Sequence, residues 1–147
     1  MNPEADKILG LTAMRLATVV APALTDSYAQ SSVGLLNFML TFVAKEYERG
    51  ADIRATENTD IREAFAELTP LVADNELKAQ LAAAARDKDT SLRISALNTA
   101  NYALRRLLTQ LQTHLEEQEG SKARAGEKRI WQLLKAIAAR RMVSLAP

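Results

Sequence analysis

Cysteine is absent from this sequence, and histidine occurs only once. Without a thiol the chain has no disulfide, no thiolate site for zinc or iron–sulfur clusters, and no cysteine nucleophile. A single histidine also argues against histidine-based metal catalysis. Aromatic residues make up only 5% of the 147 residues, and the four prolines and five glycines are few for a β-fold with many turns. The low numbers of aromatic residues, prolines and glycines favour a helical fold.

Catalytic motifs are equally scarce. His114 and Glu117 have the three-residue spacing of a ligand pair in di-iron bundles, but such a site needs two of these pairs and further carboxylates. The glycines are isolated, so no phosphate-binding loop is present, and no nucleophile-elbow sequence occurs. We therefore predict no catalytic residue, no metal site and no cofactor, and we lean against an enzyme.

The strongest helical pattern lies in residues 90–119. Seven residues recur there at gaps of three and four, which places them on one side of a single long helix. They are Ile94, Leu97, Asn101, Leu104, Leu108, Leu111 and Leu115. A face of this width is typical of a helix in a bundle, so the rest of the chain must supply the helices that pack against it.

Residues 33–44, VGLLNFMLTFVA, are apolar on nearly every side except for Asn37 and Thr41. A helix that is hydrophobic all round is either central in its own domain or covered by another subunit. Twelve residues are too few to span a membrane, which takes about twenty. We expect this helix and the long one at the centre of the bundle.

Several breaks divide the remaining sequence. Asp26 and Asp74 are expected helix caps, and Asp60 with Glu63 resembles a capping box. Pro22 and Pro70 each kink or end a helix. The inferred breaks are Gly50, a loop over 51–59 and the stretch GSKARAG at 120–126. The sequence therefore predicts an all-α, antiparallel up-and-down bundle of four to five helices. We expect one domain over 1–147, with a bundle body (1–119), a connector (120–126) and a basic amphipathic C-terminal helix (127–143).

Positive charge is concentrated near the C-terminus. The stretch 122–141 holds seven basic residues and one acid, a net charge of +6. Lys128, Arg129, Lys135 and Arg140 form a possible basic contact surface for nucleic-acid phosphates or an anionic surface. We favour the simpler interpretation, in which these charges lie against the acidic remainder of the chain or in solvent.

Polar residues within apolar faces suggest a second possible site. If Asn37, Thr41, Asn101 and Trp131 converge, they form a polar patch in a pocket between helices, which Phe38, Met39 and Phe42 would help to close. A buried asparagine more often fixes helix register or oligomeric state, because its amide must find hydrogen-bond partners.

These patterns predict a non-enzymatic assembly module that binds itself, as a homo-oligomer, or another helical protein. A binder of a small apolar ligand and a binder of nucleic acid or an anionic surface remain as alternatives. The first residues, MNPEAD, carry two acids where a secretory signal needs basic residues, and no transmembrane segment is evident. We therefore expect a cytoplasmic protein.

Overall fold

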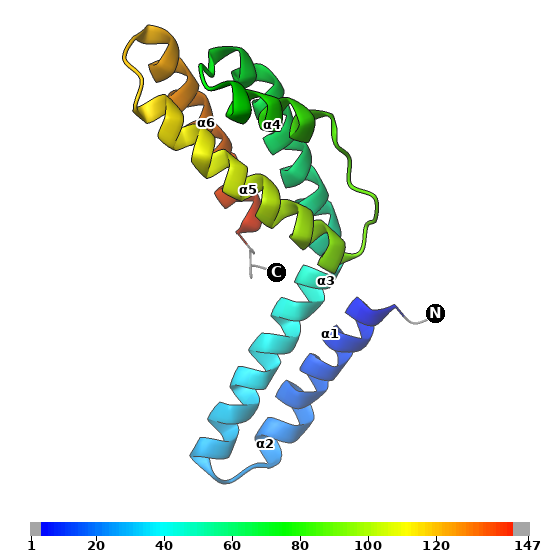
Figure 1. The fold of residues 1–147 in the computed structure, drawn as a ribbon. Helices are drawn as coiled ribbons and strands as arrows, with labels where there is room; N and C mark the ends of the chain where they lie inside the picture. The colour runs from blue at the N-terminus through cyan, green and yellow to red at the C-terminus, as the bar shows by residue number, and fades with distance from the viewer. Residues whose placement is uncertain (1–3, 143–147) are drawn as a thin grey trace. The chain divides into compact units, whose positions relative to one another are not determined.

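The computed structural model describes residues 4–142, and every regular element among them is helical (Figure 1). The all-α prediction is therefore confirmed. In chain order the elements are α1 (Ala5–Arg15), the π-helical turn η1 (Leu16–Val20), α2 (Ala21–Ala23), α3 (Ser27–Leu68), the 3-10 turn η2 (Thr69–Leu71), α4 (Asn75–Arg86), α5 (Ile94–Glu116) and α6 (Ser121–Arg141).

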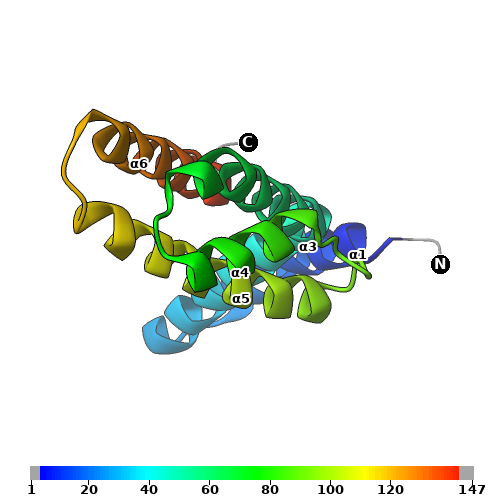
Figure 2. The ribbon, with the colours of Figure 1, turned by 45° about the horizontal axis from the view of Figure 1, so that its top comes forward.

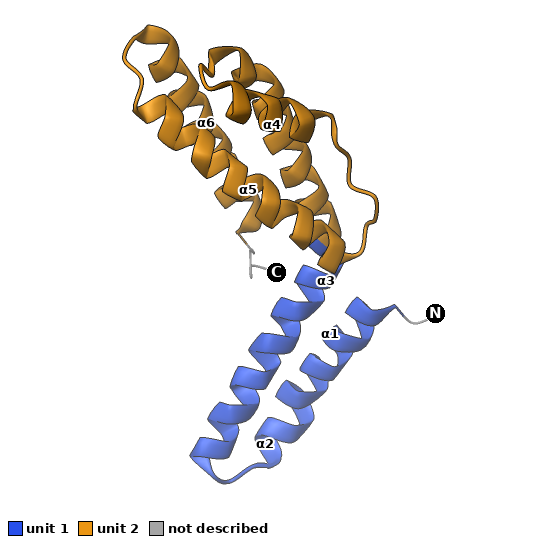
Figure 3. Cartoon of the chain, viewed as in Figure 1, with its two compact units in different colours: residues 1–50, 143–147 blue, residues 51–142 orange. Residues whose placement is uncertain are grey.

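The chain divides into two compact units (Figure 3). Unit 1 comprises residues 1–50 and 143–147, and unit 2 comprises residues 51–142. Helix α3 contributes its first part to unit 1 and its second part to unit 2. This division differs from the predicted partition into bundle body, connector and C-terminal helix. The prediction of one domain over 1–147 stays a prediction.

Unit 1 is a helical hairpin in which α1, η1 and α2 run back beside the first part of α3 (Figure 1). The turn between the two arms is fixed by side chains. As predicted, Asp26 caps α3, because its Oδ2 accepts a hydrogen bond of 2.7 Å from the amide of Ala29. Gln30 then reaches back and donates to the carbonyl of Leu24 at 2.7 Å.

Pro22 changes the helix type before the first arm ends. Proline has no amide proton, and its ring crowds the carbonyl four residues earlier, here that of Thr18. The turn η1 widens to π geometry just before this point, and the amide of Ala21 bonds to the carbonyl of Leu16, five residues back. The arm then continues through α2 and ends at Ala23. Pro70, in contrast, lies in η2, directly after the end of α3.

The predicted loop over 51–59 is wrong, because these residues continue α3 without a break. Gly50 and Asp60 accordingly lie inside the helix and do not mark its ends. Glu57 and Asn58 explain the error: both are polar, yet both are completely buried. These two polar residues interrupt the apolar spacing in the sequence, although the buried face of α3 continues through them. The buried residues of this part of α3 are Ile53, Glu57, Asn58, Ile61, Arg62, Ala64, Phe65 and Leu68.

Unit 2 is a bundle in which successive helices alternate in direction (Figure 2). Glu57, near the start of this part of α3, pairs with Asn101 from the first half of α5 and with Arg141 from the last turn of α6. Ala73, just before α4, donates to His114 near the end of α5. Helices α4 and α6 therefore run opposite to α3 and α5, as expected of an up-and-down bundle.

Most of the apolar stripe predicted for α5 is buried. Of the seven residues in its apolar stripe, Ile94 is 40% exposed, and the other six are buried. Four of these six, Leu104, Leu108, Leu111 and Leu115, pack with residues of the second part of α3, α4 and α6 in one hydrophobic cluster. Its buried members are Ile61, Ala64, Phe65, Leu68, Val72, Leu81, Leu104, Leu108, Leu111, Leu115, Ile130, Leu133 and Ile137.

The predicted connector 120–126 is also wrong, because α6 begins at Ser121. Only Gly120 forms a turn, with a φ of 117° that favours glycine. Gly126 is buried in the first turns of α6, where an added Cβ would lie 2.9 Å from Cδ1 of Leu115. Small residues here allow α6 to approach α5 closely. The predicted end of this helix, Val143, lies outside the described residues.

Candidate functional site

Large hydrophobic side chains remain exposed over most of unit 1. We call the thirteen of them the hairpin surface. They are Ile8, Leu11, Met14, Val19, Val20, Tyr28, Leu35, Leu36, Phe38, Met39, Phe42, Val43 and Tyr47. Between residues 4 and 50, only one hydrophobic side chain, that of Ala13, is buried. The expectation that the helix over 33–44 is central is therefore wrong, because six of its large apolar side chains are exposed.

The spacing of these residues gives α3 a defined outer face. Leu35, Phe38, Met39 and Phe42 follow one another at intervals of three, one and three residues, which places them on the same side of the helix. Phe38 and Met39 are each 51% exposed. They therefore do not close a pocket in the protein interior, as the ligand-binding interpretation required. The partly buried residues of α3 lie on its opposite side: Val33, Asn37, Leu40, Thr41 and Ala44.

The hairpin surface is also almost free of charge. From residue 27 to residue 44 the sequence contains no Asp, Glu, Lys or Arg. Between residues 8 and 44, Arg15 and Asp26 are the two charged side chains. Such a surface has little to attract phosphate or another ionic ligand, and its complement is a second apolar surface.

The four residues of the predicted polar patch lie in different environments. Asn37 and Thr41 belong to unit 1, where the Thr41 hydroxyl donates 2.9 Å to the carbonyl of Asn37. Asn101 belongs to unit 2 and is buried in its core, with 2% exposure. Trp131, also in unit 2, is 62% exposed on α6. Asn101 and Trp131 therefore do not line a common interior pocket.

Asn101 belongs instead to a buried polar cluster that the sequence did not predict. Its Nδ2 donates to Oε1 of Glu57 and to Oδ1 of Asn58, each at 2.9 Å. Nε of Arg105 donates to the same Glu57 oxygen at 2.7 Å, and Nε of Arg141 donates to Oε2 at 2.7 Å. The cluster thus joins α3, α5 and α6 around one carboxylate.

The donors around Glu57 keep it ionised. Burial by itself raises the pKa of a carboxyl group, because it removes water from the charged form. The hydrogen bonds from Arg141, Asn101 and Arg105 lower it by more, so the pKa of Glu57 lies below its ordinary value. A carboxylate held in this way is a poor proton acceptor, which argues for a structural role and against general-base catalysis.

The cluster extends to the segment between α4 and α5. Nδ2 of Asn58 donates to both carboxylate oxygens of Asp89 at 3.1 Å, and a guanidinium nitrogen of Arg62 donates to Oδ1 at 2.8 Å. Burial raises the pKa of Asp89, but the hydrogen bonds from Arg62 and Asn58 bring it below its ordinary value. These bonds fix the start of the extended segment that leads into α5.

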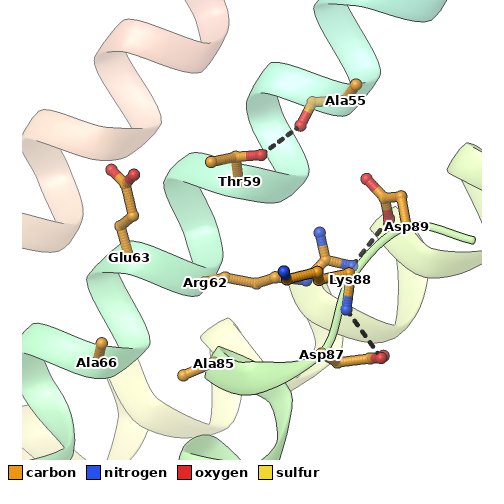
Figure 4. Close-up of a pocket in the computed structure, with 9 residues that line it drawn as sticks. All are labelled: Ala55, Thr59, Arg62, Glu63, Ala66, Ala85, Asp87, Lys88 and Asp89. Carbon is orange, nitrogen blue, oxygen red and sulfur yellow. Dashed lines mark hydrogen bonds and ion pairs between the residues drawn. The ribbon is translucent and has the colours of Figure 1, made fainter.

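Arg62 also forms part of the wall of a pocket of about 490 Å³ between α3, the end of α4 and the segment 87–89 (Figure 4). Ala55, Ala66 and Ala85 contribute apolar surface to its lining, and Thr59 adds a hydroxyl group from α3. The lining side chains carry charges of both signs, so they favour neither an anion nor a cation. They are Arg62, Lys88, Glu63, Asp87 and Asp89.

Two residues of the predicted basic contact surface are held in ion pairs, and the other two are exposed. Arg129 forms an ion pair of 2.6 Å with Glu67, and Arg140 forms one of 2.7 Å with Asp60, both on α3. The hydrogen bond from Arg129 lowers the pKa of Glu67 and raises that of Arg129. Lys128 and Lys135 are exposed on the outer side of α6.

Comparisons with known proteins add no relative. No protein-family model, curated protein or solved structure matches this chain. Within residues 4–142, no group of three or more His, Asp or Glu side chains is placed to hold a metal ion. No helix in the same range is both long enough and apolar enough to cross a membrane. The function must therefore be argued from the geometry of the hairpin surface and of α6.

Sequence reasoning found Asn101 but missed its partners. Glu57 lies four residues from both Ile53 and Ile61, so its helical spacing was a usable signal. Glutamate is rarely fully buried without a partner, so its residue type favours an exposed position and outweighs the spacing. The partners Arg105 and Arg141 come from distant parts of the chain, and no local pattern links them to Glu57.

Proposed function

We propose that this protein is an assembly module that associates with a second copy of itself through the hairpin surface. The observation that carries the proposal is the exposure of thirteen large hydrophobic side chains on a hairpin that buries almost none. Helices in folded proteins derive most of their stability from packing an apolar face against other elements. Unit 1 has little such packing of its own.

The size of the hairpin surface supports this proposal. Large apolar side chains of about 200 Å² that are half exposed leave on the order of 1,000 Å² of apolar surface over thirteen residues. A typical monomer exposes a largest apolar patch of roughly 300–600 Å², and a stable interface buries about 800 Å² on each partner. The apolar area exposed on the hairpin is therefore sufficient to supply a stable dimer interface.

A second copy is the occupant best suited to such a surface. Because the surface is nearly uncharged, it matches an identical surface without placing like charges against each other. Two hairpins packed through their outer faces would form a four-helix arrangement, with Leu35, Phe38, Met39 and Phe42 of each α3 along the seam.

The test is the mass of the purified protein in solution, measured by native mass spectrometry and by light scattering from 1 to 100 μM. The wild-type protein is expected to be a dimer or a larger closed oligomer. The double variant Leu35→Glu with Met39→Glu places two charges on the outer face of α3 and is expected to be monomeric.

A matched control uses two exposed hydrophobic residues of unit 2. Leu92→Glu with Tyr102→Glu introduces the same charge at positions that are 73% and 70% exposed, and it should leave the oligomeric state unchanged. A wild-type protein that is monomeric at every concentration contradicts the proposal. So does an oligomer that both double variants leave intact.

A further inference from the structure

The outer side of α6 carries an exposed row that we call the basic stripe: Arg124, Lys128, Trp131 and Lys135. Intervals of four, three and four residues place these side chains on one side of the helix. The buried residues of α6 lie on the opposite side and pack into the core: Ala123, Gly126, Ile130, Leu133 and Ile137. The stripe therefore faces away from unit 2 along about 16 Å of helix.

The cations of the stripe differ from the three arginines of α6 that lie nearer to α3. Arg129, Arg140 and Arg141 each form an ion pair with an acid of α3. Arg124 and Lys128, one turn apart, make no ion pair with any residue between 4 and 142, and neither does Lys135. Like charges one turn apart slightly destabilise a helix, so folding does not account for this arrangement.

Trp131 is the only tryptophan of the protein, and it is 62% exposed in the middle of this row. Tryptophan usually buries most of its large apolar surface. Here it lies three residues after Lys128 and four residues before Lys135, so cations flank an accessible indole on both sides. A flat aromatic ring between cations is the combination that binds a base and its neighbouring phosphates.

We propose that the basic stripe binds single-stranded nucleic acid, with Trp131 stacking on a base and the three cations contacting phosphates. This activity is independent of the self-association proposed above. A duplex fits less well, because its bases are already stacked on one another. A protein partner fits less well because lysine is depleted at protein interfaces. A membrane fits less well because the apolar face of α6 is already buried in the core, so α6 cannot embed it in lipid.

The test uses Trp131 as its own reporter. A twelve-nucleotide thymidine oligomer is titrated into the full-length protein, and the tryptophan fluorescence is followed at 50 mM salt. Stacking is expected to quench the emission, whereas an abasic oligomer of equal length should bind more weakly and quench little. With three phosphate contacts, log Kobs should fall against log salt with a slope of about −2.

Variants separate the parts of the stripe. Trp131→Ala is expected to weaken binding of a dye-labelled oligomer by roughly five- to a hundredfold, whereas Trp131→Phe should retain most of the affinity. Arg124→Gln with Lys128→Gln and Lys135→Gln should abolish the quenching. The control of equal charge, Lys78→Gln with Arg86→Gln and Arg93→Gln, alters exposed residues on other elements and should still bind. Circular dichroism shows whether each variant is folded.

Three results would overturn this assignment. The first is the absence of quenching and of oligomer binding at 50 mM salt. The second is binding that the stripe variant and the control variant weaken equally, which indicates general charge attraction. The third is a higher affinity of the protein, reported by Trp131 fluorescence, for vesicles of phosphatidylserine and phosphatidylcholine or for polyglutamate than for the thymidine oligomer. The last result would assign the stripe to an anionic membrane or an acidic protein.

Discussion

Asn101 and Glu57 are 44 residues apart in the sequence, and their side chains form a 2.9 Å hydrogen bond in the core of unit 2. Both residues are almost completely buried. A buried carboxylate is costly unless it is fully paired. Arg105 and Arg141 complete the pairing, so the three helices α3, α5 and α6 fit together in only one register around Glu57.

Removing the charge of Glu57 should therefore destabilise unit 2. Glu57→Gln keeps the shape of the side chain but leaves the guanidinium groups of Arg105 and Arg141 without a carboxylate. Both arginines are partly exposed, so we expect a loss of about 2–3 kcal/mol in the free energy of unfolding, below the full effect of breaking a buried pair. Urea unfolding measures this loss. Glu63→Gln, an exposed change on the same helix, should cost less than about 0.5 kcal/mol.

The same cluster predicts how stability depends on pH. The pKa values of Glu57 and Asp89 are lower in the folded protein than their ordinary values, which are about 4.3 and 3.9 in an unfolded chain. Protons therefore bind the unfolded state more readily. The stabilisation is complete above about pH 5 and is lost as the pH falls through 4 and below. Unfolding free energies measured from pH 7 to pH 3 should show this decline, and Glu57→Gln should make it shallower. A decline of unchanged steepness in that variant would contradict this origin.

The sequence predicted the long helix well because its pattern is simple. In α5, six of the seven stripe residues are buried, and the caps Asp26 and Asp74 each accept the expected amide hydrogen bond. Errors arose where the core is polar or made of small residues. The sequence predicts a loop at Glu57, although this residue occupies a core position of α3. It predicts a connector at Gly126, although this residue is a packing position of α6.

The candidate surfaces were predicted less completely, because their limits depend on tertiary contacts. The spacing in α6 marked Lys128 and Lys135 as basic contacts, and both are exposed. It could not show that Arg129 would be held by Glu67, since those residues are 62 positions apart. The sequence marked the helix over 33–44 as unusually apolar, but no local pattern distinguishes a buried apolar helix from an exposed one.

The Arg129–Glu67 pair permits a test of whether an ion-paired basic residue of α6 takes part in binding at the basic stripe. The pair is partly exposed on both sides, so Arg129→Gln should lower the free energy of unfolding by less than about 1 kcal/mol. Because Arg129 is directed toward α3, the same change should leave binding at the basic stripe within about twofold of wild type. Urea unfolding and the thymidine titration measure the two effects. A tenfold loss of affinity would instead make Arg129 part of the contact surface.

Gly126 provides the sharpest test of how α6 packs. Alanine normally stabilises a helix relative to glycine by about 0.5–1 kcal/mol. At Gly126, however, the new Cβ would lie 2.9 Å from Leu115 and 3.3 Å from Leu71, and overpacking of a core costs roughly 1–3 kcal/mol. We expect Gly126→Ala to lower the free energy of unfolding by about 0.5–2 kcal/mol, as measured with urea. Gly10 in α1 has nothing within 4 Å of an added Cβ, so Gly10→Ala should be neutral or stabilising. If Gly126→Ala stabilised the protein as much as helix propensity alone predicts, α6 would not pack closely against α5 at this position.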